Sequence, residues 1–280
     1  MPEGDTVWHT AQQLHEALTD RTLTRTDFRV PRLATADLSG RRVLETVPHG
    51  KHLLTRVEGG LTLHSHLGMD GRWRISAPAR SPGGGPAHQI RAVLTTEDRM
   101  ATGFRLPLLE LLRTSEESAA TGHLGPDLLG PDWDADEAEH RLLAGPARPL
   151  AEALLDQRNL AGTSPWTPVG DLPGTLLPRL LAAAKKLLEA NKDTFDRRTT
   201  KAALRSPGSA RYDSDRALWV YGRTHRPCHR CGTTVRTGTY GPPDRPRTVW
   251  YCPRCQPGPV PETSGGPGRT SPRTSPPHDN

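Results

Sequence analysis

Four short segments follow one another at nearly even spacing: RRVLETV (41–47), KHLLTRV (51–57), LTLHSHL (61–67) and RWRIS (72–76). Glycine-containing turns separate them, and further segments of the same apolar kind occupy 90–95 and 104–112. Short strands with turn signals at this spacing are typical of all-β domains. The pattern therefore predicts a β-sandwich or barrel in the first part of the chain.

Helical patterns flank these strands. Over residues 5–18, Val7, Ala11, Leu14 and Leu18 fall on one face of an amphipathic helix, whose predicted N-cap is Asp5 or Thr6. After about residue 114 the sequence predicts helices over 134–143, 149–160 and 172–190. We therefore expect an α+β protein with four regions: an N-terminal helix plus β-sandwich (1–113), a helical domain (114–210), a cysteine module (216–256) and a disordered tail rich in Pro, Gly and Ser (257–280).

Size and charge narrow the class of protein. A chain of 280 residues suits two or three domains, and its formal net charge is +6, from 37 Lys and Arg against 31 Asp and Glu. Arginines concentrate in or near the cysteine module: Arg216, Arg223, Arg226, Arg230, Arg236, Arg245, Arg247 and Arg254. Such a patch can bind a nucleic-acid backbone, although a solvated basic face explains it equally well at this point.

No apolar run approaches the roughly 20 residues that a membrane-spanning helix needs. The N-terminal residues also lack the basic and then apolar pattern of a secretory signal. We therefore expect a cytoplasmic protein, associated with the nucleoid, that has no membrane partner.

The four cysteines form two CxxC pairs, Cys228 with Cys231 and Cys252 with Cys255. Two pairs separated by the length of a β-hairpin are typical of a closed Cys₄ site that binds one structural Zn²⁺. A redox CxxC motif and a chance repetition are the alternatives, and neither accounts for two pairs at this distance. His225 and His229 are competing ligands by position, but with four thiolates available we expect both to face solvent or DNA.

The sequence starts Met1-Pro2-Glu3. Removal of Met1 would leave Pro2 as a secondary amine near the positive end of the first helix, which favours the free, nucleophilic amine. Beside it, Glu3 would transfer protons. Met-Pro starts are common, so these residues alone do not establish a catalytic role.

The chain resembles the formamidopyrimidine-DNA glycosylase and endonuclease VIII family in five segments that occur in family order: PEGDTV (2–7), HGKHLL (49–54), LHSHLGMDGRW (63–73), LGPD (124–127) and the four cysteines. The resemblance runs from residue 2 to about residue 256. It implies a monomeric, bifunctional DNA glycosylase and AP lyase of base-excision repair that acts on damaged DNA. The Pro-Glu-Gly start is similar to the endonuclease VIII branch, which favours oxidised pyrimidines.

The resemblance also implies roles for individual residues. Pro2 would attack C1′ of the damaged nucleotide, Glu3 would be the general acid and base, and Lys51 would assist elimination and contact phosphate. Arg247, five residues before Cys252, matches the zinc-finger arginine that binds the phosphate flanking the lesion. Met69 matches the apolar wedge that fills the gap left by the flipped nucleotide, although a core methionine is almost as good an interpretation. Pro2 and Lys51 would then reach the DNA from one side and Arg247 from the other.

Three features depart from the family pattern. LLDQRNLAG (154–162) resembles the first helix of its helix-two-turn-helix motif but continues directly into TSPW (163–166). The second helix and its phosphate-binding asparagine are therefore predicted to be absent, which would weaken DNA binding. His123 occupies a position where an arginine is common. Finally, the wedge of the formamidopyrimidine branch is not found around residues 102–107, which disfavours 8-oxoguanine as the main substrate.

Two other functions remain open on the sequence. A catalytically weakened relative would bind damaged or single-stranded DNA without cutting it. A zinc-ribbon DNA-binding regulator would make the N-terminal motif a coincidence. The presence of Pro2, Glu3, Lys51 and Arg247 together favours the enzyme.

Overall fold

The computed structural model describes residues 3–79, 84–147, 150–155, 169, 172–200, 203–204, 214–240 and 247–256. The chain forms two compact units, Met1–Tyr212 and Asp213–Asn280. The four-region division made from the sequence stays a prediction. Two of its particulars, the shortened helix-two-turn-helix segment beyond Leu155 and the 257–280 tail, lie outside the described residues.

The first unit starts with helix α1 (Gly4–Leu18), whose predicted apolar face is confirmed because Val7, Ala11, Leu14 and Leu18 are all buried. The predicted N-cap is wrong. The helix begins one residue earlier than Asp5, so Glu3 is the N-cap, and its carbonyl accepts the first helical hydrogen bond from Val7 N at 3.0 Å. Asp5 is instead a buried side chain of the first turn.

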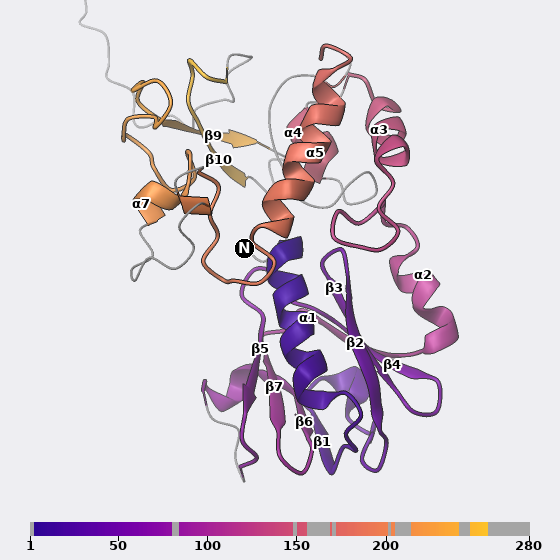
Figure 1. Ribbon diagram of the computed structural model, residues 1–280. Helices are drawn as coiled ribbons and strands as arrows, with labels where there is room; N and C mark the ends of the chain where they lie inside the picture. The colour runs from indigo at the N-terminus through magenta and orange to yellow at the C-terminus, as the bar shows by residue number, and fades with distance from the viewer. Residues whose placement is uncertain are drawn as a thin grey trace, which may run out of the picture. The chain divides into compact units, whose positions relative to one another are not determined.

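A sandwich of two antiparallel four-stranded sheets follows α1 (Figure 1). One sheet has the order β1-β6-β7-β5, with β1 (Arg25–Phe28), β6 (Ile90–Thr95), β7 (Met100–Phe104) and β5 (Arg72–Ser76). The other has the order β2-β3-β4-β8, with β2 (Val43–His49), β3 (His52–Val57), β4 (Leu61–His66) and β8 (Leu108–Arg113). The predicted β-sandwich is confirmed. Its core combines apolar residues of both sheets with α1: Leu14, Leu53, Leu63, Ala92, Leu94 and Ala101.

One strand prediction was wrong, and the strands β1 and β7 were not predicted from the sequence. The segment 104–112 is not one strand, because the chain turns at Arg105, whose φ is 50°, so that β7 ends in one sheet and β8 starts in the other. β1 has the sequence RTDF, which lacks the apolar alternation that marked the other strands. Three 3₁₀ turns complete the sandwich: η1 (Pro31–Leu33), η2 (Ala87–Gln89) and η3 (Thr114–Glu116).

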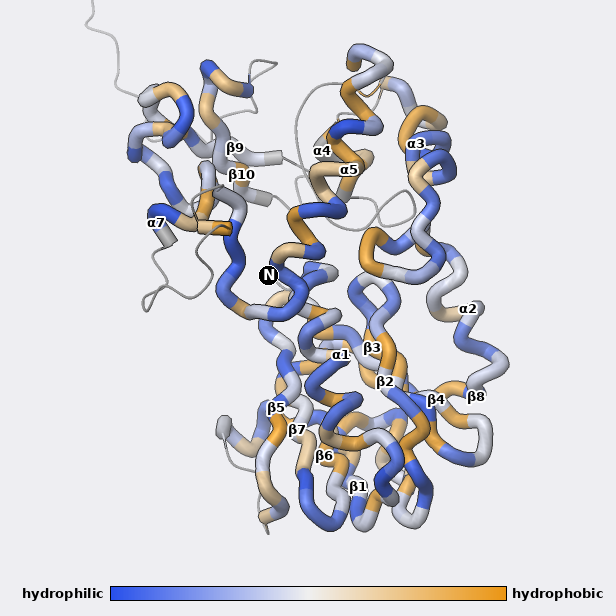
Figure 2. Tube along the Cα trace, viewed as in Figure 1, coloured by the Kyte–Doolittle hydropathy of each residue, from blue (hydrophilic) through white to orange (hydrophobic). Residues whose placement is uncertain are grey.

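The later part of the first unit is helical, as predicted, with α2 (Glu117–Thr121), α3 (Ala135–Leu143), α4 (Leu150–Leu155) and α5 (Leu176–Glu189). Helix α3 begins where the sequence placed it, because the Asp134 carboxylate accepts hydrogen bonds from two backbone N–H groups of the first turn. Apolar residues of α3, α4 and α5 bury one another in a separate core that includes Leu142, Leu154, Leu177 and Leu181. Figure 2 shows hydrophobic and hydrophilic stretches alternating along α3 and α5.

The second unit contains α7 (Ser214–Ala217), β9 (Arg236–Tyr240) and β10 (Arg247–Tyr251). The two strands pair antiparallel, with Arg247 opposite Tyr240 and Tyr251 opposite Arg236. The core of this unit is small and consists of Val235 with two cysteines. Across the described residues of both units, no helix has the length and apolar character needed to cross a membrane.

Candidate functional site

Lys51 lies at the tip of the β2–β3 hairpin. His49 and His52 pair across the hairpin, so Gly50 and Lys51 form its two-residue turn. Gly50 has φ 58°, a conformation that glycine adopts without a Cβ penalty. The turn directs Lys51 inward, and only 11% of its side chain is exposed.

The Lys51 ammonium meets the carboxylate of Glu3, with Nζ and Oε2 2.7 Å apart. Glu3 is only 12% exposed and caps α1, where the partial positive charge of the helix end also favours a carboxylate. No other partner of Oε2 is found among the described residues. Glu3 therefore has a carboxylate oxygen that can accept or donate a proton beside the amine of Lys51.

Asp127 holds the Lys51 turn in place. Its Oδ2 accepts the Gly50 N–H at 2.8 Å, and its Oδ1 accepts the Leu129 N–H at 3.0 Å. The carboxylate is buried, so each of these hydrogen bonds replaces one that water would otherwise make. Asp127 lies in the LGPD segment (124–127), and no role was predicted for its side chain. A signal was available, because an aspartate after Gly-Pro commonly accepts local backbone N–H groups.

Arg197 positions the first turn of α1 and was not predicted from the sequence. Its guanidinium contacts both oxygens of the Asp5 carboxylate. Nε lies 2.8 Å from Oδ2, and a second nitrogen contacts Oδ1. It also donates to the Thr6 hydroxyl at 3.3 Å. Because Asp5 and Arg197 are 192 residues apart in the sequence, only the fold brings this pair together.

Four histidines surround the base of the Lys51 turn. The ring of His52 stacks on that of His64 and lies edge-on to those of His66 and His123. Burial, and then the neighbouring imidazoles, lower the pKa of His52 to about 3. Burial and the Lys51 ammonium also lower the pKa of His66, whose Nδ1 accepts the Gly68 N–H at 2.9 Å. Both rings are therefore neutral at physiological pH.

The remaining predicted DNA-contacting residues are placed separately. Pro2 lies outside the described residues, and Arg247 is the first residue of β10. Met69 projects from the turn that follows β4, which a hydrogen bond from Gly71 N to Leu67 O closes, and it is 65% exposed. A side chain this exposed is not part of the core, so the core-methionine interpretation is wrong. The functional roles of these three residues stay predictions.

The four cysteines come together in the second unit, as expected. Their sulfurs lie within 4.8 Å of one another, with Sγ of Cys231 3.5 Å from that of Cys252 and 3.4 Å from that of Cys255. Hydrogen bonds from Thr233 lower the pKa of Cys231 to about 6, whereas the contact with Cys231 raises the pKa of Cys255 to about 12. A cation would offset this mutual repulsion. The donor set fits a metal ion, and it includes neither His225 nor His229.

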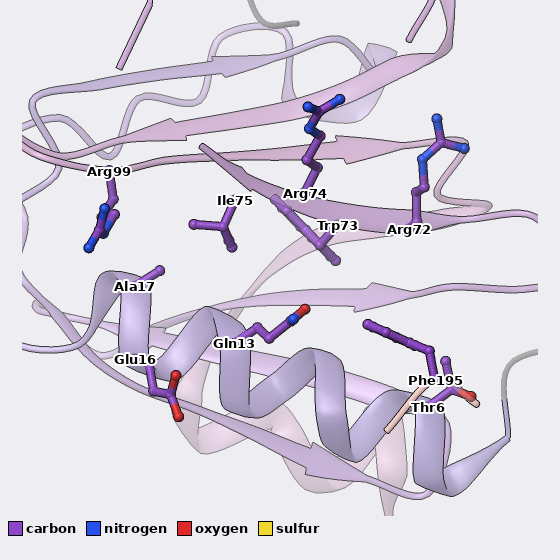
Figure 3. Close-up of a pocket in the computed structure, with 10 residues that line it drawn as sticks. All are labelled: Thr6, Gln13, Glu16, Ala17, Arg72, Trp73, Arg74, Ile75, Arg99 and Phe195. Atoms are coloured by element: carbon purple, nitrogen blue, oxygen red, sulfur yellow. The ribbon is translucent and has the colours of Figure 1, made fainter. Parts of the chain in front are cut away.

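A surface pocket of about 730 Å³ lies elsewhere on the first unit, between α1 and β5. Figure 3 shows Arg72, Arg74 and Arg99 on its strand side, with Gln13 and Glu16 on α1 opposite them. Neither Glu3 nor Lys51 lines it. The pocket is therefore distinct from the Glu3–Lys51 pair, and the catalytic geometry does not involve it.

Comparisons with known proteins bear on the whole chain. The model of the formamidopyrimidine-DNA glycosylase N-terminal domain matches residues 1–105. The chain is 56% identical to "Probable endonuclease 8 2" of Streptomyces coelicolor, over 96% of this chain and 98% of that protein. It belongs to the formamidopyrimidine-DNA glycosylase and endonuclease VIII family. Within the family it is endonuclease VIII-like, which confirms the resemblance seen in the sequence.

Two further comparisons agree. The chain is 45% identical to the "DNA-(apurinic or apyrimidinic site) lyase Nei2" of Mycolicibacterium smegmatis, over 91% of this chain and 99% of that protein. Its fold matches that of the Lactococcus lactis family member Fpg, solved with DNA that contains N7-benzyl-Fapy-dG. The TM-score is 0.74 at 20% identity, over 92% of this chain and all of the other. The expected α+β family fold is thereby confirmed.

Proposed function

We propose that this chain is a bifunctional DNA glycosylase and AP lyase of base-excision repair that excises oxidised pyrimidines from damaged DNA. The observation that carries the proposal is the Glu3–Lys51 ion pair, which lies at the start of α1 directly after Pro2 in the chain. Family membership supports it, since relatives are named endonuclease 8 and DNA-(apurinic or apyrimidinic site) lyase. The Pro-Glu-Gly start supports the pyrimidine preference.

The chemistry assigns one task to each residue. The nitrogen lone pair of Pro2 attacks C1′ of the damaged nucleotide, and the base leaves with the electrons of the glycosidic bond and a proton. Glu3 protonates the sugar ring oxygen, so that the ring opens to an iminium, the Schiff base. Loss of the C2′ and then the C4′ proton expels the 3′ and the 5′ phosphate in turn. Lys51 holds phosphate during these β- and δ-eliminations.

In the second unit, Cys228, Cys231, Cys252 and Cys255 would hold one Zn²⁺ as a structural crosslink. Zinc would supply rigidity to the β9–β10 hairpin and no open coordination position for chemistry. Arg247, at the start of β10, would bind the phosphate that flanks the lesion, and Met69 would fill the space of the flipped nucleotide. We further propose that the protein acts as a monomer in the cytoplasm, at the nucleoid, with the four regions expected from the sequence.

Borohydride trapping tests the proposal. The matured protein, Pro2→Thr, a Met1-retaining form and the control His88→Gln, a change on the exposed η2 turn, would each be mixed with oligonucleotides that contain an abasic site or 5-hydroxyuracil. A covalent adduct on both DNAs, lost in the two N-terminal variants and kept in the control, is expected. An adduct on the abasic site alone would reject base excision while supporting a lyase.

A second candidate function rests on the LLDQRNLAG–TSPW junction (154–166), where the resemblance predicts that the second helix of the clamp is absent. A chain with a weakened clamp would bind damaged or single-stranded DNA without excising bases. Tight binding of a folded, zinc-loaded protein to the same oligonucleotides, without any adduct, would favour this function over the enzyme.

A further inference from the structure

A line of three polar side chains crosses one sheet of the sandwich and ends beside Lys51. Glu110 on β8 contacts His64 on β4, with Oε1 and Nδ1 2.8 Å apart. His64 then contacts His52 on β3, with Nε2 and Nδ1 2.7 Å apart. His52 follows Lys51 directly at the hairpin. The line therefore links the edge strand of the sheet to the candidate active site.

The chemistry of the three groups sets the direction of both hydrogen bonds. An ionised carboxylate only accepts, so His64 donates from Nδ1 to Glu110. A neutral His64 then accepts at Nε2, which makes Nδ1 of His52 the donor. Nε2 of His52 is left with a lone pair, and no hydrogen bond to it is found among the described residues. The free end of the line is therefore a base.

The charged groups around the line favour a proton on His64, at the Glu110 end, rather than on His52. Burial, and then the charge that His64, His66, His123 and His49 can carry, lower the pKa of His52 and so oppose a charge there. His64 is almost fully buried, but it touches the Glu110 carboxylate, and the Glu117 carboxylate also lies near it. An imidazolium is therefore more stable at His64, next to a carboxylate, than at His52.

We propose that His52, His64 and Glu110 form a proton relay for the elimination steps, in which His52 is the proton acceptor and the other two are positioning residues. The inference rests on the proposed function. Each elimination releases a proton from carbon, whereas Glu3 is assigned to the sugar oxygen and Lys51 to phosphate. A separate acceptor completes the site.

One relay step can be written in full. The C2′–H bond of the Schiff base breaks, its electron pair forms the C1′–C2′ double bond while the C1′–N π pair moves onto the Pro2 nitrogen, and its proton binds Nε2 of His52. In the same step the Nδ1 proton of His52 moves to Nε2 of His64, which becomes an imidazolium against the Glu110 carboxylate. The enamine electrons then expel the 3′ phosphate, which leaves with the C3′–O pair. The relay has gained one proton and returns it to water through His52.

Kinetics with two matched variants test the relay. His52→Asn keeps an amide donor near the Nδ1 position but cannot titrate, and Glu110→Gln keeps an acceptor for His64 but has no charge. Both are expected to keep borohydride trapping on abasic DNA and to cut the strand about 10²-fold more slowly. Glu110→Gln also removes the charge at the far end of the relay, so the pH dependence of strand cleavage should differ from that of the wild type. The control His88→Gln should behave as the wild type does.

Imidazole ¹⁵N NMR of the free protein gives a readout that does not depend on activity. At neutral pH, His52 and His64 should both carry their proton on Nδ1, as the two contacts of the line require. The opposite tautomer of His52 would overturn the relay, as would wild-type cleavage rates and pH profiles in both variants. If the wild-type protein forms no adduct, the proposed function itself is wrong, and the relay then has no elimination step to serve.

Discussion

The Lys51 end of the sandwich and the cysteine unit hold their functional residues by different means. A large two-sheet core supports Lys51, Glu3 and Asp127, and buried hydrogen bonds and ion pairs orient these side chains. Among the described residues of the cysteine unit, the buried core cluster consists of Cys228, Val235 and Cys252, and two of these are candidate metal ligands. A unit with so small a core depends on a crosslink for its stability. Packing therefore preorganises the first region, whereas we expect metal binding to organise the second.

Metal removal should give the largest effect, and it tests directly whether metal binding organises the cysteine unit. Cys252→Ser, or treatment with a chelator, should unfold the Asp213–Asn280 unit, because apparent zinc-binding energies in zinc-finger peptides are about 10–16 kcal/mol. Limited proteolysis should then cut this unit and leave the sandwich intact, and elemental analysis should show the loss of zinc. The variant His229→Gln, outside the sulfur cluster, should keep both metal and protection. A unit that stays protected without metal would contradict the comparison.

Glu3→Gln should give the next largest effect, on activity rather than on folding. Loss of the acid and of the Lys51 ion pair should slow base release roughly 10²–10⁴-fold, because general acid–base groups contribute that much. Single-turnover excision of 5-hydroxyuracil measures it. Glu16→Gln, an exposed carboxylate on the same helix, is the matched control. Excision that is equally fast in both variants would remove Glu3 from the mechanism.

Asp127→Ala tests whether buried hydrogen bonds position the Lys51 turn. The change leaves the Gly50 and Leu129 N–H groups without their acceptor and should destabilise the first unit by roughly 1–3 kcal/mol. Strand cleavage at an abasic site should fall as well, because the turn that carries Lys51 loses its anchor. Chemical denaturation and cleavage assays measure the two effects, with the exposed Asp132→Ala as control. Loss of stability with unchanged cleavage would make Asp127 purely structural.

Met69→Ala should have the smallest effect on stability, within about 0.5 kcal/mol, because the side chain is exposed. A wedge is needed only where a nucleotide leaves a stacked duplex. Excision from duplex DNA should therefore fall several-fold, while cleavage at a single-stranded abasic site should not. Leu44→Ala removes another exposed apolar side chain and should leave both activities unchanged. An equal loss on duplex and single-stranded DNA would argue against the wedge.

Much of the architecture was readable in the sequence because local patterns carry it. Alternating apolar segments with glycine turns predicted the sandwich, the 3.6-residue period predicted α1, α3 and α5, and paired CxxC motifs predicted the sulfur cluster. Local exceptions account for the misses. A positive φ at Arg105 divided one expected strand, and the polar β1 strand had no apolar signal.

The sequence was sufficient for the residue types and the family because motifs and periodicity are local properties. It showed that the chain has a Pro-Glu start, a lysine on a hairpin turn and four cysteines at hairpin spacing. Only the tertiary structure decided which groups meet: Arg197 on Asp5, Asp127 on Gly50, and the line from Glu110 to His52. Such contacts join residues far apart in the chain, and burial determines which of them remain charged. Neither property is contained in any short stretch of sequence.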